Sequence, residues 1–130
     1  MTCTGQTIEL SMTKGRVSLR LTAVQAGADW VVTIYGGDRP HVGAVALAAA
    51  STVGAASTVG AAPVGQSLSL PNHKEGELAE TTAATLASAL GTAVSVSCGV
   101  HLDGATREEI ALVKEMVALL ARDLYQVAVR

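Results

Sequence analysis

Three histidines are the residues best suited to chemistry in this sequence, and each lies where a predicted element begins or ends. His41, His73 and His101 each lie near Gly, Pro or Asn, with an acidic or basic residue within four positions. His73 and Glu77 are four residues apart at a predicted helix start, so both project from the same side of that helix. This pair can hold a divalent metal ion, with His41 or His101 as further nitrogen ligands. The sequence contains neither CxxC nor HExxH spacing, so a metal site rests on these four residues.

The start of the same helix also suits an anion. The first turn of a helix has free backbone N–H groups that attract phosphate. Lys74 lies beside them, Gly76 leaves access, and Arg39, just after a Gly36-Gly37 turn, offers a second cationic contact. The simpler alternative is an ordinary capped helix with a solvated Lys74.

A cysteine nucleophile is the third chemistry to consider. Cys98 is three residues from His101, but the alternating pattern places it with Val96 and Val100 on a buried face. A structural cysteine is therefore expected. Because no G-x-S-x-G, P-loop or GxGxxG motif occurs, no activated nucleophile is in view and the protein is not expected to be an enzyme.

Alternating apolar and polar residues predict the strands that position these groups. The predicted strands cover residues 7–12, 17–23, 30–35, 66–70 and 93–100. Another strand, 42–49, is apolar on both faces and is expected to lie centrally.

Two helices are also predicted. The first has Asn72 as its N-cap, Glu75 completing a capping-box-like pair, and Gly91 at its end. The second opens at a capping box formed by Thr106 and Glu109. Its apolar stripe contains Ile110, Val113, Val117, Leu120 and Leu124. With neighbouring residues this stripe covers about half of the helix, which favours a subunit interface and a homo-oligomer. The element order predicts an α+β fold: a two-layer sandwich with a mostly antiparallel sheet and two helices on one face.

Composition limits the function further. The 130 residues form one domain, 1–130, with 9 Lys and Arg against 11 Asp and Glu. This balance lacks the basic excess of a nucleic-acid-binding protein. The charge-free stretch between Arg39 and Lys74 is interrupted by Ser, Thr, Gly and Pro, so no membrane span is expected. No secretory signal is visible and the two cysteines are far apart, which favours the cytoplasm. A six-residue duplication within 50–61 predicts a low-complexity loop at about 50–62.

The histidine segments resemble a known family. They read GG-x-x-PHVGAV at 36–45, HKE-x-EL at 73–78 and GVHLD at 99–103, followed by EEI at 108–110. The chain resembles the LpdD-like small proteins, the D component associated with gallate decarboxylase and related UbiD-type decarboxylases. The duplicated loop departs from the family pattern.

The resemblance implies a non-catalytic chaperone that binds prenylated FMN, or FMN, and helps to load a UbiD-type decarboxylase. The expected cofactor-binding residues are Arg39, His41, His73, Lys74, Glu77, His101 and Asp103. A divalent metal at the histidines stays compatible with this function. Two alternatives remain open: a small metal-dependent hydrolase or isomerase using the same histidines, and a structural oligomer without a ligand.

Overall fold

The computed structural model describes residues 5–50, 64–71 and 75–130. The elements in chain order are β1 (Thr7–Lys14), β2 (Val17–Ala26), β3 (Asp29–Gly37), β4 (Ala44–Ala49), β5 (Val64–Ser69), α1 (Gly76–Leu90), β6 (Ala93–His101) and α2 (Arg107–Ala128). All the predicted strands and both predicted helices are present, and only their ends differ from expectation. The expected loop at about 50–62 lies, apart from Ala50, outside the described residues.

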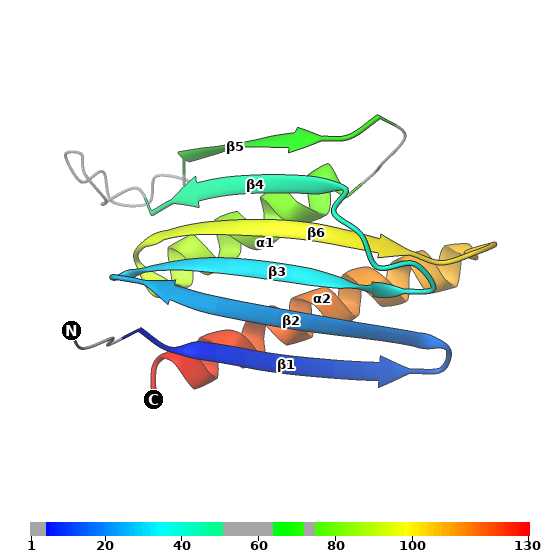
Figure 1. The fold of residues 1–130 in the computed structure, drawn as a ribbon, viewed down its shortest axis with the longest axis horizontal. Coiled ribbons are helices and arrows are strands. Elements are labelled where there is room, and N and C mark those ends of the chain that lie inside the picture. Colours follow the sequence, from blue (N-terminus) through cyan, green and yellow to red (C-terminus); the bar gives the residue numbers. More distant parts are fainter. Residues whose placement is uncertain (1–4, 51–63, 72–74) are drawn as a thin grey trace.

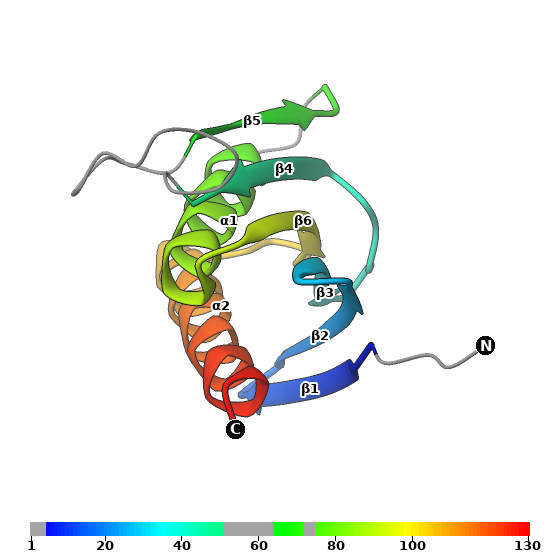
Figure 2. The same cartoon turned by 90° about the vertical axis from the view of Figure 1, so that its left-hand side faces the viewer.

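The strands form one six-stranded sheet in the order β1-β2-β3-β6-β4-β5. Only the β3–β6 pair is parallel, and the other pairs are antiparallel. Both helices lie on the same face of this sheet (Figures 1 and 2), with α1 over β4, β5 and β6 and α2 over β1 and β2. The predicted α+β architecture with two helices on one face is confirmed.

The core between the two layers follows from the alternation in the strands. On β2, Leu19 and Leu21 are buried against the helices, whereas Ser18 and Arg20 point to the opposite face. The facing side of α1 consists mainly of small residues: Ala79, Thr82, Ala83, Leu86 and Ala87. Small side chains allow a helix backbone to approach the sheet closely, so α1 packs directly onto β4 and β6.

The apolar stripe of α2 is used within the chain itself. Met116, Leu120 and Leu124 are fully buried, and only Ile110 and Tyr125 remain substantially exposed. The expectation that this stripe forms a subunit interface is therefore wrong. Its width reflects packing against both the sheet and the neighbouring helix.

The helix ends show two correct predictions and one incorrect prediction. At α2 the capping box is present, because Glu109 N donates to Thr106 Oγ1 and Thr106 N donates to Glu109 Oε1, both at 3.1 Å. At α1 the N-cap is Glu75 rather than Asn72, and its side chain makes no capping hydrogen bond. Gly91 ends α1 in the left-handed conformation, with φ 67°, as expected. No helix within the described residues is long and apolar enough to cross a membrane.

The strand predicted at 42–49 also needs a correction. β4 starts at Ala44 and is fifth in the sheet, next to the edge strand β5. Its alanines face the helices, but Val45 and Leu47 on the other side are exposed. The apolar pattern predicted burial on both faces of this strand. No element of the described chain covers the outer face of β4.

Strand direction brings the chemically interesting segments to one edge. β3, β5 and β6 run in the same direction, so their C-terminal ends meet at the right-hand edge in Figure 1. Helices α1 and α2 both begin at this edge. His41 follows β3 and His101 is the last residue of β6, whereas His73, which follows β5 in the sequence, lies outside the described residues. We call this side of the molecule the histidine edge.

Candidate functional site

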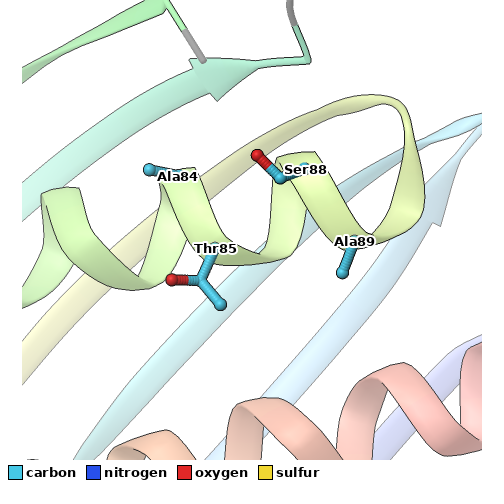
Figure 3. Close-up of a pocket in the computed structure, with 4 residues that line it drawn as sticks. All are labelled: Ala84, Thr85, Ser88 and Ala89. Carbon is cyan, nitrogen blue, oxygen red and sulfur yellow. The ribbon is translucent and has the colours of Figure 1, made fainter. Parts of the chain in front are cut away.

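A groove of about 1120 Å³ runs between α1 and α2, starting at the histidine edge. From α1 its walls include Leu78, Thr81, Thr85, Leu86 and Ala89, and from α2 they include Ile110, Val113, Lys114, Val117, Ala118, Ala121, Arg122 and Tyr125. Figure 3 shows that Thr85 and Ala89 point toward α2, whereas Ala84 and Ser88 point away from α2. Most of the lining is apolar, and the volume is large enough for a cofactor-sized ligand.

The inner end of the groove is polar. It is lined by His41, Glu75, Glu77 and His101 at the histidine edge. Three of these four residues, His41, Glu77 and His101, were predicted as site residues. Glu75 was predicted only as part of a helix cap.

His41 and Glu75 form a sheltered hydrogen-bonded pair. His41 Nδ1 lies 2.9 Å from the Arg39 carbonyl oxygen. His41 Nε2 lies 3.0 Å from Glu75 Oε1. Both distances are those of hydrogen bonds, so the imidazole ring is held between the backbone and the carboxyl group. The two side chains are only 24% and 12% exposed.

The second oxygen of Glu75 is the most unusual atom at this end. Glu75 Oε2 is buried and has no hydrogen-bond partner among the described residues. Leaving a buried carboxyl oxygen unsatisfied costs about 1–3 kcal/mol, so such atoms usually mark a place where a ligand or water donates. Glu75 therefore offers an acceptor at the inner end of the groove.

Cys98 lies close to this pair but is not available for chemistry. Burial and, as the smaller cause, the charge of Glu75 together raise the pKa of the Cys98 thiol to about 12. The thiol stays protonated at neutral pH and packs against its apolar neighbours. The prediction of a structural cysteine is confirmed.

Gly99 explains how His41 reaches Glu75. The chain passes from β3 to β4 across the end of β6, because β6 lies between them in the sheet. In this crossing the backbone of His41 rests directly on Gly99, where any Cβ would overlap the His41 carbonyl. Only glycine permits this approach, which holds the His41 ring beside the start of α1.

His101 belongs to a second, more exposed cluster. Its Nε2 lies 3.0 Å from Asp103 Oδ1, and Arg39 NH2 lies 3.4 Å from the same oxygen. The His101 and Asp103 side chains are 47% and 58% exposed. Of this cluster only His101 lines the groove, so the prediction that Arg39 and Asp103 contact the cofactor has no support from the geometry.

Arg16, which was not among the predicted site residues, links several segments of the histidine edge. Its guanidinium donates to Asp38 Oδ2 at 3.0 Å, to the Asp103 carbonyl at 2.9 Å and to both carboxyl oxygens of Glu109. Arg16 and the Thr106 backbone lower the pKa of Glu109 to about 2. This clamp joins the β1–β2 turn to the start of α2. No local sequence signal marks it, because its partners are 22 to 93 residues away.

The proposed metal ligands are not brought together among the described residues. No group of three or more His, Cys, Asp and Glu side chains within them is arranged to hold an ion. His41 bonds to Glu75 and His101 to Asp103, each with its own carboxylate partner. His73 and Lys74, the centre of the predicted metal and phosphate sites, lie outside the described residues.

The cations that the structure does place on the groove are Lys114 and Arg122. With Ile110 and Ala118 they follow a four-residue spacing along one side of α2. Lys114 makes no ion pair within the described part of the chain, whereas Arg122 lies 3.6 Å from Asp123. The spacing is visible in the sequence, but only the packing of α1 shows that this side lines a groove.

Comparison with known proteins decides the family. The model of the prenylated flavin chaperone LpdD-like domain matches residues 13–128. The chain belongs to this family. That match confirms the resemblance drawn from the histidine segments, all of which lie inside the matched range.

A solved structure shows that the fold is shared more widely. A chain described as part of a novel chaperone complex for yeast 20S proteasome assembly superposes with a TM-score of 0.64. The superposition covers 95% of this chain and 96% of the other, at 11% sequence identity, so it supports the fold alone. Comparison with curated proteins gives no match.

Proposed function

We propose that the groove between α1 and α2 binds prenylated FMN and that the protein delivers this cofactor to a UbiD-type decarboxylase without catalysis of its own. The observation that carries the proposal is the groove itself, in a chain of the prenylated flavin chaperone family. Its volume, apolar walls, exposed cations and buried acceptor each match a part of a prenylated flavin nucleotide.

The fit can be argued residue by residue. Leu78, Ile110 and Ala118 offer apolar surface for the ring system and the prenyl group, and Tyr125 offers the one aromatic face. Lys114 and Arg122, on the rim of the groove, suit the phosphate. At the inner end, Glu75 Oε2 can accept a hydrogen bond from an N–H or O–H group of the ligand.

The functional groups of the described residues favour binding of the cofactor over catalysis. The Cys98 thiol is protonated and buried, and the His41–Glu75 pair has no nucleophile beside it among the described residues. The groove is open between two helices, so a ligand can leave without unfolding of the core. The flavin would supply any chemistry of the bound cofactor, and the chain would supply binding and shelter.

Two neighbouring substitutions on α1 test the site. Thr85→Trp places a large side chain in the groove, whereas Ser88→Trp places the same side chain at a neighbouring position that does not line the groove and points away from α2 (Figure 3). In titrations with FMN and prenylated FMN followed by flavin fluorescence, Thr85→Trp is expected to weaken binding at least about tenfold, the equivalent of about 1.4 kcal/mol. Ser88→Trp should bind like wild type.

The same variants test delivery. Wild type and Ser88→Trp are expected to raise the yield of active enzyme from an apo decarboxylase, and Thr85→Trp is not. Unchanged affinity of Thr85→Trp would remove the groove from the proposal. Tight binding with no effect on the yield of active decarboxylase would contradict the chaperone role, as would decarboxylation by the isolated protein.

A further inference from the structure

The face of the sheet opposite the helices carries large apolar side chains. Those facing outward are Val24, Val31, Val45, Leu47 and Leu68, which are 40% to 82% exposed. Strand register makes them contiguous: Val24 pairs with Val31, Ser95 joins Val31 to Leu47, and Val45 pairs with Leu68. We call these five residues the outer patch. Figure 2 shows no helix on this side of the sheet.

The charges of this face lie on β1, β2 and β3. Glu9, Arg20 and Asp29 occupy outward-facing positions, and Asp29 accepts hydrogen bonds from Thr92 Oγ1 and Ala93 N, whereas β4 and β5 contain no charged residue. Exposed sheet faces and edge strands are normally protected by charged side chains, and Lys in particular discourages pairing with other chains. β1 follows this rule with Glu9 and Lys14, and β5 does not. The uncharged end is therefore unsuited to permanent contact with water.

The size of the outer patch matches what a second copy of the chain requires. Its five residues are each 40% to 82% exposed, which corresponds to a patch on the order of a few hundred Å². A standard interface buries about 800 Å² on each partner, of which about 56–65% is apolar. The outer patch therefore supplies a large part of the apolar surface that one side of such an interface needs.

Its charge pattern also suits a two-fold dimer. In such an interface the same patch meets itself, so any charge at its centre would face an identical charge. The outer patch avoids this because β4 and β5 are uncharged, and the small outward side chains of Ser95 and Ser97 between the strands allow two sheets to approach.

We infer that the protein forms a homodimer in which the outer patches of two copies pack sheet against sheet. This placement leaves the groove between α1 and α2 open, because the groove lies on the opposite face of the molecule. The inference is independent of the proposed cofactor.

Matched substitutions on the two edge strands test the interface in the full chain. Leu68→Lys introduces a charge into the outer patch at a side chain that is 82% exposed, so the fold should tolerate it. Ser11→Lys introduces the same charge on the outer face of β1, outside the outer patch. We expect sedimentation equilibrium to give a dimer for wild type and Ser11→Lys, and a dissociation constant at least about tenfold higher for Leu68→Lys.

Circular dichroism and thermal unfolding of each variant establish that the fold is retained. A wild-type protein that stays monomeric at 100 μM would overturn the inference, whatever else covers the outer patch in the cell. A Leu68→Lys dimer as stable as wild type would overturn it equally, because the interface would then lie elsewhere. A folded Leu47→Lys variant, which alters the neighbouring strand, should give the same weakening as Leu68→Lys.

Discussion

Two histidine–carboxylate pairs lie at the same edge of this protein and differ in what surrounds them. His41 and Glu75 come from segments 34 residues apart, are sheltered, and leave a buried carboxyl oxygen without a described partner. His101 and Asp103 are two residues apart, exposed, and joined by Arg39. A charge pair in water contributes little energy, whereas a sheltered pair with an unsatisfied oxygen is costly unless something binds there. Environment therefore separates a candidate ligand contact from a surface contact between the same chemical groups.

The largest effect is expected where the sheltered pair is positioned. Gly99→Val forces a side chain into the space of the His41 carbonyl, so the crossing segment must move away from β6. We expect a loss of about 3 kcal/mol in the free energy of unfolding, measured in urea, because overpacking a close contact typically costs about 1–3 kcal/mol. Gly104→Ala is the comparison: its Cβ would meet no atom, but its φ of 62° strains any L side chain and costs about 1–2 kcal/mol. A loss for Gly99→Val no larger than that for Gly104→Ala would mean that the overlap with the His41 carbonyl is not what makes Gly99 necessary.

A smaller effect is expected from neutralising each carboxylate in turn. Glu75→Gln removes the negative charge and replaces one carboxyl oxygen by an amide nitrogen, and should weaken flavin binding about tenfold, because hydrogen bonds to charged groups contribute about 1.5–3 kcal/mol. Asp103→Asn makes the same chemical change in the exposed pair and should change affinity less than about twofold. Calorimetric titration measures both constants. Similar affinities of the two variants for the flavin would contradict the proposal that Glu75, and not Asp103, contacts the ligand.

The sequence predicted local features better than contacts between distant segments. The capping box at Thr106 and the glycine end of α1 follow from neighbouring residues, and both are present. The N-cap of α1 was predicted at Asn72, which lies outside the described residues, but the N-cap is Glu75. Residue preferences alone did not fix the residue at which this helix begins. Glu75 and Arg16 acquire their roles from partners at least 22 residues away, which no periodicity encodes. The groove depended on the packing of α1 beside α2, so its cations on α2 were missed although their spacing was visible.

The smallest effect concerns the Arg16 clamp beside the exposed pair, and it depends on pH. The pKa of Glu109 is lowered to about 2 in the folded protein, mainly by its hydrogen bond to Arg16, from an ordinary value near 4.5. A carboxyl group with a depressed folded pKa stabilises the protein above its unfolded pKa, and that contribution disappears as the pH falls toward 2. Urea unfolding of wild type and Arg16→Ala should therefore show a stability difference that is largest above pH 5 and shrinks between pH 4.5 and about pH 2. The control Arg20→Ala, on the outer face of β2, should show no such narrowing. If the difference between wild type and Arg16→Ala were constant across this range, Arg16 would act through packing or through its bond to the Asp103 carbonyl, and the ionisation of Glu109 would not contribute to holding the histidine edge.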